Sequence, residues 1–346
     1  DLVHALKRKG DLALRAPRAP AQGDLKSHTA SYAEILVISG FADLDDLRCG
    51  VANWDDLFSL VSPDLIIADH SPTAILAARG RIPTFVVGNG FTVPPATLQS
   101  YPALMAGRSA PAIQTALCAH VNAILTDRGV PAIKHLPEFL EGDARAVFSL
   151  PGLDPYGALR ETPLLGLYED GLEPFPPSLE NRLFLYGHTG APDFTSLIKA
   201  ALATELPISA YLSGNNAEIS YLLNRQGAEV FDTPPALGDI LPRTRLVVSN
   251  GGAGLSQAAL VAGCPQIIYP IHTESQMTAQ ALHQRGCAAL LDAASEPTMD
   301  TLILAAASDA TLQQNCQQTA HVLHKMLPKN PLTHLAETAW TLMASP

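Results

Sequence analysis

The sequence predicts an α/β protein with two doubly wound parallel sheets (Rossmann-like domains) that face each other across a cleft. Three observations support this prediction. Short apolar strands alternate with helical segments in both halves of the chain, and a stretch rich in proline separates the halves. In the second half an apolar strand runs directly into a glycine loop and then a helix, at residues 246–263. The length of 346 residues is enough for two domains of ordinary size.

The first half alternates helices and strands. Trp54, Leu57, Phe58 and Val61 recur at helical spacing, and Pro63 ends that helix. The apolar runs that follow are short and end at polar or glycine residues, which is typical of buried strands. The expected helices are 53–61, 73–79 and 112–125, and the expected strands are 64–68, 83–87 and 146–150.

The chain opens on residues 1–10, which read as the interior of a helix with no strand before it. An α/β domain usually begins with a buried strand. We therefore expect that further residues, including a first strand, precede Asp1.

The second half restarts the same alternation after the proline-rich stretch. We expect an acceptor-side Rossmann-like domain at 1–160, incomplete at its start, and a linker at 161–181. A donor-binding domain at 182–330 and a C-terminal helix at 331–346 follow. The expected strands are 182–186, 207–212, 228–231, 246–249, 266–269 and 288–291, and the expected helices are 196–203, 217–225, 255–262, 278–285, 312–327 and 332–343.

Composition limits the function classes. The chain is 47% hydrophobic and 16% charged, with a formal net charge of −11 and no dense run of lysine and arginine. This balance argues against nucleic acid as a partner. The five cysteines show no CxxC spacing, and no apolar run is long enough for a membrane span. We expect a cytoplasmic protein without a metal or an integral membrane span, whose partners are small molecules; the sequence does not indicate an oligomeric state.

The glycine loop at Asn250–Gly254 is the strongest functional signal. Glycines let a ligand approach the backbone, and the start of the helix offers unpaired N–H groups at the positive end of the helix dipole. Such a site suits a phosphate or a pyrophosphate. The alternative is a tight strand-to-helix turn that binds nothing.

The segments 249–254 (Ser-Asn-Gly-Gly-Ala-Gly) and 259–265 (Ala-Leu-Val-Ala-Gly-Cys-Pro), followed by Pro270 and Glu274, resemble the donor-binding region of GT-B nucleotide-sugar glycosyltransferases. The similar group includes bacterial UDP-glycosyltransferases and macrolide glycosyltransferases. Segments 64–73 and 90–95 resemble the acceptor domain of that family, so the resemblance covers most of residues 30–340.

The resemblance implies an inverting, metal-independent transfer from a nucleoside-diphosphate sugar to a hydroxyl group. A UDP-sugar or dTDP-sugar would be the co-substrate, with no bound cofactor. In the family a histidine after the first strand is the base, which would lie upstream of Asp1, and an aspartate that matches Asp69 orients it. His70 is the alternative base within this chain, and capping of the next helix is the alternative role of Asp69.

The other site residues fall into three groups. The donor sugar would contact Glu274, Ser275 and Gln276, and the acceptor pocket would include Phe91, Thr92 and Pro94. For these residues, helix capping and loop packing are the structural alternatives. The donor diphosphate would contact Asn250, Gly251, Gly252, Ala253, Gly254 and Ser256, with Gly187 and His188 from the end of another strand.

Four positions depart from the family pattern. Asn250 stands where the family has histidine, Leu255 replaces a small hydroxyl residue, and Ala258 replaces an acidic residue. Ser275 breaks the usual acidic-glutamine pair, with Gln276 one place late. These departures leave two other functions open: a non-catalytic GT-B partner or regulator of an active enzyme, and a nucleotide-sugar epimerase.

Overall fold

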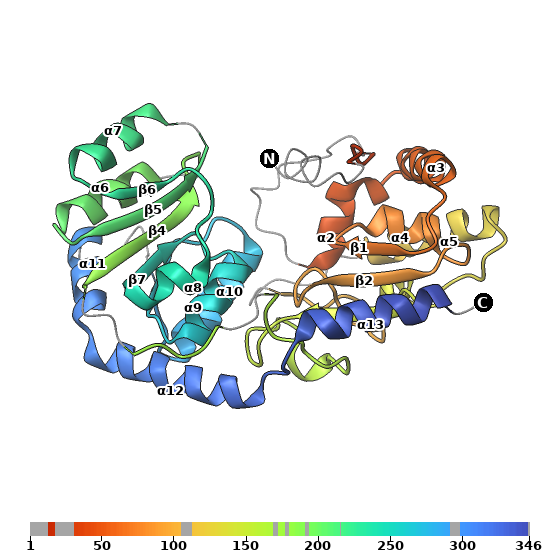
Figure 1. Ribbon diagram of the computed structural model, residues 1–346. Coiled ribbons are helices and arrows are strands. Elements are labelled where there is room, and N and C mark those ends of the chain that lie inside the picture. The colour runs from red at the N-terminus through yellow and green to blue at the C-terminus, as the bar shows by residue number, and fades with distance from the viewer. Residues whose placement is uncertain are drawn as a thin grey trace.

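The computed structural model describes residues 13–17, 31–104, 113–168, 172–176, 180–190, 194–214, 216–290 and 298–344. Two α/β units lie side by side in Figure 1, each with its own parallel sheet. The helical reading of residues 1–10 lies outside the described residues.

The first sheet has the order β1-β2-β3, and its strands are parallel. Each strand is followed by a helical connection, which is the arrangement that parallel pairing requires. The strands are β1 (Ile66–Asp69), β2 (Thr84–Asn89) and β3 (Ala144–Phe148). The helices of this half are α2 (Tyr32–Leu36), α3 (Leu44–Val61), α4 (Pro72–Ala78) and α5 (Gln114–Asp127), with the short helices η1 (Val37–Phe41), η2 (Leu136–Leu140) and η3 (Gly157–Leu159).

The second sheet has six parallel strands in the order β6-β5-β4-β7-β8-β9. Its strands are β4 (Arg182–His188), β5 (Ile208–Ser213), β6 (Glu229–Phe231), β7 (Thr244–Ser249), β8 (Gln266–Ile268) and β9 (Ala288–Leu290). The helices are α6 (Phe194–Ala203), α7 (Ala217–Arg225), α8 (Leu237–Ile240), η4 (Leu241–Arg243), α9 (Ala253–Ala262), α10 (Thr273–Gln284), α11 (Met299–Ser308), α12 (Ala310–Met326) and α13 (Pro331–Ala344).

The strand order of the second sheet reverses between β4 and β7. The first three strands of this sheet extend in one direction from that point, and the last three extend in the other. Ligands of doubly wound sheets bind beyond the carboxyl ends of the strands at this reversal. The carboxyl ends of β4 and β7 therefore mark the place to look for a site.

Each unit has its own apolar core. Helices α6, α9, α11 and α12 contribute buried side chains to the core of the second sheet, including Ile198, Leu260, Ile303 and Cys316. The core of the first half is built around residues such as Leu36, Leu76 and Leu125. The α/β prediction with parallel sheets is confirmed.

The chain returns to the first unit at its C-terminal end. Helix α13 runs beneath β2 in Figure 1, far from the second sheet. Leu335, Ala339 and Leu342 of this helix pack against a small cluster that contains Phe85 and Phe148. The predicted domain boundaries, including the separate helix at 331–346, stay a prediction.

The proline-rich stretch makes specific contacts where it is described. The backbone N–H of Leu165 donates to Val147 of β3 at 2.8 Å, and that of Phe175 donates to Ala262 of α9 at 3.1 Å. Leu172 is buried in the core of the second sheet. The segment thus packs against both units on its way between them.

Helix α3 begins nine residues before the expected start, at Leu44 rather than Asn53. Asp43 caps this helix, because its side chain accepts hydrogen bonds from the N–H groups of Asp45 and Asp46 at 2.9 Å. Gly50 lies inside α3, and a glycine at that position makes the sequence look less helical than it is. A Cβ at that position would lie 3.3 Å from Thr73 Cγ2, so the glycine lets α3 pack closely against the α4 region.

Candidate active site in the cleft

A cavity of about 370 Å³ lies between the two units at the reversal point of the second sheet. We call it the large cavity. From the first unit it is lined by the ends of β1 and β2, and from the second by the start of α9. Its lining residues are Asp69, Asn89, Thr92, Phe148, Gly166, Leu167, Tyr168, Tyr186, Pro234, Pro235, Leu237, Ala253, Gly254, Leu255, Gln257 and Ala258. None of these lining residues is a lysine or an arginine, so backbone dipoles must supply any attraction for an anion.

Helix α9 presents its N-terminus to the large cavity. Its N-cap residue Gly252 makes no side-chain capping hydrogen bond, and the first backbone bond of the helix runs from Ser256 N–H to Gly252 C=O. The N–H groups of Ala253, Gly254 and Leu255 precede that bond. Uncapped first-turn N–H groups at a helix start form a ready site for an anion.

The glycines of the loop have different roles. Gly251 has φ = +77°, and a Cβ there would lie 2.5 Å from Ile268 Cγ2. This glycine is required by the fold, since both the backbone conformation and the space exclude a side chain. A Cβ at Gly252 or Gly254 would meet nothing within 4 Å. These two glycines leave open space in front of the backbone, which a ligand can use.

Asn250 joins two strand ends. Its Oδ1 accepts a hydrogen bond from His188 N–H at 3.1 Å, and its Nδ2 donates to the Tyr269 carbonyl at 3.4 Å. The Asn250 amide therefore bridges the ends of β4 and β8. Gly187 is buried at the end of β4, and the exposed His188 accepts through Nδ1 from Gly190 N–H at 2.9 Å.

Asp69 and His70 are neighbours in sequence but line different cavities. Asp69 ends β1 and lines the large cavity. His70 has φ = +44° and lines a separate cavity of about 380 Å³ with Trp54 and Pro72. Burial raises the pKa of Asp69 although the His70 charge opposes it, and burial lowers the pKa of His70 although the Asp69 charge opposes that. The carboxylate, and not this imidazole, faces the cleft.

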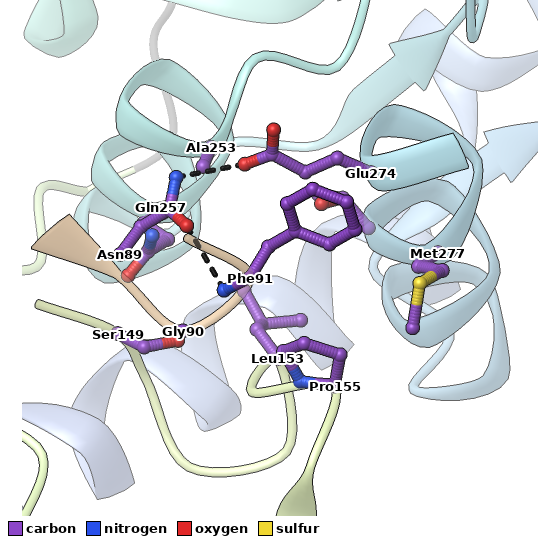
Figure 2. Close-up of a pocket in the computed structure, with 11 residues that line it drawn as sticks. Asn89, Gly90, Phe91, Ser149, Leu153, Pro155, Ala253, Gln257, Glu274 and Met277 are labelled. Carbon is purple, nitrogen blue, oxygen red and sulfur yellow. Dashed lines mark hydrogen bonds between the residues drawn. The ribbon is translucent and has the colours of Figure 1, made fainter. Parts of the chain in front are cut away.

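Glu274 lies in the first turn of α10, and its carboxylate accepts a hydrogen bond from a residue of the first unit. Asn89 Nδ2, at the end of β2, donates to Glu274 Oε1 at 2.8 Å (Figure 2). Both residues line a small cavity of about 20 Å³, together with Phe91, Ala253 and Gln257. Burial raises the pKa of Glu274, and the hydrogen bond from Asn89 partly offsets that rise. Glu274 thus has its carboxylate at the junction of the two units.

Three other predicted donor residues lie away from both cavities. Ser275 is fully buried, and its hydroxyl oxygen accepts from Ile271 N–H at 3.0 Å and from His272 N–H at 3.1 Å. That hydroxyl caps α10. Ser256 is fully buried inside α9, and Gln276 follows Ser275 on α10. None of the three lines the large or the small cavity, and the linings also lack Gly187, His188, Asn250, Gly251 and Gly252.

The loop after β2 carries the predicted acceptor residues. Asn89 Oδ1 accepts from the N–H groups of Phe91 and Thr92, both at 2.9 Å, which fixes the turn. Phe91 lines the small cavity and Thr92 lines the large one. Pro94 is buried, and its carbonyl accepts a hydrogen bond from Arg145. Two of the three residues therefore reach the cleft.

Sequence reasoning missed several residues that the fold brings to the cleft. The most informative are Asn89, Gln257, Tyr168 and Tyr186, which all line the large cavity. Tyr168 stacks on Phe148 with ring centroids 3.8 Å apart, and burial raises its pKa to about 12. Asn89 and Tyr186 stand at or just after the ends of predicted strands, whereas Tyr168 lies in the proline-rich stretch and Gln257 lies inside a predicted helix.

The described residues contain neither a metal-ligand cluster nor a helix that could span a membrane. The His, Cys, Asp and Glu side chains in these ranges form no group of three that could hold a metal ion. No helix within the same ranges has the length and apolarity needed to cross a bilayer.

Replacing Glu274 with Gln is expected to raise the free energy of unfolding at pH 7–8. The raised pKa means that the folded state prefers the protonated acid, so the ionised carboxylate lowers stability once the pH exceeds the folded-state pKa. A glutamine keeps the oxygen that accepts from Asn89 and carries no charge. The gain should shrink as the pH falls through the raised folded-state pKa and vanish below about 4.3, the ordinary pKa of glutamate.

Urea unfolding of both proteins across pH 4–8 measures this difference. Glu218→Gln is the matched control, because the Glu218 carboxylate is exposed on α7 and forms an ion pair with Lys199. If Glu218→Gln raises the free energy of unfolding as much as Glu274→Gln does, burial of the Glu274 carboxylate is not the cause.

Comparisons with known proteins agree with this geometry. The elloramycin glycosyltransferase ElmGT of Streptomyces olivaceus is 30% identical over 255 residues, which cover 70% of this chain. The chain spans 60% of the length of that relative. No family model matches the chain.

Solved structures show the fold. The crystal structure of the kitacinnamycin glycotransferase has a TM-score of 0.65 at 19% identity and covers 98% of this chain and 89% of its own. The Streptomyces sp. SF2575 glycosyltransferase SsfS6, complexed with thymidine diphosphate, has a TM-score of 0.50 at 19% identity over 86% of this chain and 77% of its own. The chain has the GT-B fold, and the resemblance to GT-B glycosyltransferases of this group is confirmed.

Proposed function

We propose that this protein is a glycosyltransferase that moves a sugar from a nucleoside-diphosphate donor to a hydroxyl group of a small-molecule acceptor, with inversion and without a metal ion. The observation that carries the proposal is the open N-terminus of α9 at the reversal point of the second sheet. It faces the large cavity, where the described lining contains no cationic side chain. A helix N-terminus stabilises a diphosphate both as substrate and as leaving group.

The reaction forms one bond and breaks another. The acceptor oxygen attacks the anomeric carbon from the face opposite the diphosphate, the bond from that carbon to the phosphate oxygen breaks, and the hydroxyl proton passes to a base. We assign the donor diphosphate to the first turn of α9 with Gly252 and Gly254, where a Cβ would meet no atom. Glu274 at the cavity junction would accept hydrogen bonds from the sugar hydroxyls.

Asp69 is assigned to orient the base. It ends β1 and lines the large cavity, where a carboxylate beside an imidazole would hold the ring and stabilise its charged form. The family resemblance implies a histidine as the source of that imidazole. His70 is not assigned this role, because it lines the cavity with Trp54 and Pro72 instead.

The comparisons favour a dTDP-sugar as donor. SsfS6 is complexed with thymidine diphosphate, and ElmGT is an elloramycin glycosyltransferase. The proposed acceptor class is therefore an aglycone comparable in size to that of elloramycin. UDP-sugars are the alternative donors. The five cysteines are unpaired, which supports action in the reducing cytoplasm.

Product analysis tests the proposal. The protein is incubated with dTDP-glucose or UDP-glucose and a set of hydroxylated aglycones, and mass spectrometry detects the added hexose. The proposal predicts a β-linked product from the α-linked donor by NMR, at an unchanged rate in excess EDTA. Retention of the anomeric configuration, or loss of the activity with EDTA, would contradict the mechanism.

One observation favours a non-catalytic role as the second candidate. Asn250 stands at the family's histidine position, and both ends of its amide are engaged by strand ends. A protein that binds the nucleotide but forms neither a glycoside nor an epimerised donor would support this reading. An altered sugar on the recovered nucleotide would instead support an epimerase.

Gly254→Leu is expected to weaken nucleotide binding at least tenfold with little change in stability. A leucine Cβ at this site meets no protein atom and the side chain points into open space in the cavity, where it competes with the ligand. Glycine is also the poorer helix former by about 1 kcal/mol relative to alanine, so the substitution does not cost helix stability.

Gly251→Ala is the matched control for this prediction. It should destabilise the fold, because Gly251 has a positive φ and a Cβ there would collide with Ile268. Calorimetric titration with dTDP and thermal unfolding of both variants separate the two effects. If Gly254→Leu binds dTDP as tightly as the wild type does, the diphosphate does not bind at the first turn of α9.

A further inference from the structure

Gln257 has a buried amide oxygen in the wall between the two cavities. The residue is 6% exposed, and its Oε1 has no hydrogen-bond partner among the described residues. Gln257 lines both the small and the large cavity, as do Asn89 and Ala253. An amide oxygen buried without a partner costs about 1–3 kcal/mol. Such an atom in a cavity wall points to a ligand that donates a hydrogen bond.

The neighbouring Asn89 is not that donor in the structure, because Gln257 Oε1 has no hydrogen-bond partner among the described residues. Its Nδ2 donates to Glu274, and its Oδ1 accepts from Phe91 and Thr92 (Figure 2). The amide is therefore fixed in one orientation. Glu274 on α10 and Gln257 on α9 present two acceptor groups at the small cavity. That cavity, at about 20 Å³, has room for about one water, so a sugar would reach Gln257 from the large cavity, which Gln257 also lines. A ligand with several hydroxyl groups matches a wall of acceptors, because each hydroxyl carries a hydrogen to donate.

The position of Gln257 on α9 fixes which part of a donor it can reach. It lies four residues after Ala253, on the same face of the helix and about 6 Å further along the axis. Helix side chains lean toward the N-terminus, so the Gln257 amide points back toward the first turn. A group attached directly to a diphosphate on that turn would lie beside this amide.

We propose that Gln257 is a specificity-determining residue for the donor sugar, whose Oε1 accepts a hydrogen bond from one sugar hydroxyl. This inference rests on the proposed function, since it needs a sugar on the diphosphate at α9. It adds a residue to Glu274, the one predicted sugar contact that lines a cavity among the described residues. The substrate class it selects is a donor sugar that keeps a hydroxyl group at the position facing α9.

Calorimetric titration of the whole chain tests the inference. The ligands are dTDP, dTDP-glucose and four dTDP-glucose analogues in which the 2-, 3-, 4- or 6-hydroxyl is replaced by hydrogen. The variants are Gln257→Leu, which removes the amide at similar volume, and Gln257→Glu, which keeps an acceptor oxygen. Gln313→Leu is the control, because Gln313 is also a buried glutamine but donates to the carbonyl of Gly263, at the opposite end of α9 from Ala253.

We expect the wild type to prefer dTDP-glucose over one analogue by about threefold to tenfold, the range for one neutral hydrogen bond. Gln257→Leu should abolish that preference and leave dTDP affinity within twofold of the wild type. Gln257→Glu should keep the preference for dTDP-glucose over that analogue. Gln313→Leu should also keep this preference, although its melting temperature should be lower.

Two results would overturn the inference alone. In the first, Gln257→Leu weakens the binding of dTDP and of dTDP-glucose by the same factor. In the second, Gln257→Leu leaves the preference for dTDP-glucose over the analogue unchanged. A change only in the KM of the acceptor would move Gln257 to the acceptor site and also overturn it. Failure of the wild type to bind dTDP or UDP would overturn the proposed function, and the inference with it.

Discussion

Replacing Asp154 with Ala is expected to destabilise the protein by about 3–5 kcal/mol, the cost of leaving a buried charge unpaired. Arg160 makes a two-point contact with Asp154, with Nε–Oδ2 at 2.7 Å and Nη2–Oδ1 at 2.8 Å. Both side chains are 2% exposed. The guanidinium also donates to the carbonyls of Gly90 and Val93, so it holds the loop after β2.

The alanine variant leaves the Arg160 charge buried with two carbonyl partners and no counter-charge. Gly90 belongs to the same arrangement, since a Cβ there would lie 2.6 Å from Asp154 Oδ1. The loop that carries Asn89 to Thr92 into the cleft therefore depends on this ion pair. Loss of the pair should disturb the cleft as well as the fold.

Urea unfolding measures the effect. Asp127→Ala is the control, because Asp127 pairs with Arg48 at 3.1 Å with both side chains about half exposed, and an exposed pair contributes about 0–1 kcal/mol. Asp154→Leu combined with Arg160→Met removes both charges and should recover much of the lost stability. A loss below about 1 kcal/mol in Asp154→Ala would show that the pair is not desolvated.

Glu274→Ala is expected to lower kcat/KM for transfer by about 10-fold to 100-fold and to leave dTDP affinity nearly unchanged. A hydrogen bond to a charged group contributes about 1.5–3 kcal/mol, and the carboxylate is assigned to the sugar and not to the diphosphate. Glu274 lines the small cavity, while the open turn of α9 faces the large one.

Steady-state kinetics with dTDP-glucose and titration with dTDP check both halves of this expectation. Asn89→Ala is a useful companion variant, because it removes the group that donates to Glu274 and leaves the carboxylate in place. Equal losses of transfer and of dTDP affinity in Glu274→Ala would show that the residue supports the structure of α10 and does not contact the sugar.

Most of the sheet architecture could be predicted from the sequence. All nine strands of the described residues overlap predicted strands, because apolar runs that end at polar or glycine residues identify buried parallel strands. Helix starts were less visible. Helix α10 begins at Thr273 and not at Thr278, because His272 and Ser275 cap it in a way that the apolar pattern does not show.

The site was only partly predictable. The glycine loop and Glu274 carry local patterns that a sequence shows, and both lie at the cleft. The partner of Glu274 could not be found that way, since Asn89 is 185 residues away. The loop pattern also treats its glycines alike, whereas a Cβ would collide at Gly251 and meet nothing at Gly252 or Gly254. Only the packing of β8 against the loop separates them.

The most direct test of the central claim is the thermal and chemical stabilisation of the protein by UDP, dTDP, GDP and ADP, with Gly252→Asp as the control variant. We expect one nucleotide to stabilise the protein by about 2.7 kcal/mol at 100 times its dissociation constant, and Gly252→Asp to abolish that effect because it places a carboxylate at the start of α9. Absence of stabilisation by all four nucleotides, or equal stabilisation of Gly252→Asp, would contradict a diphosphate site at this helix.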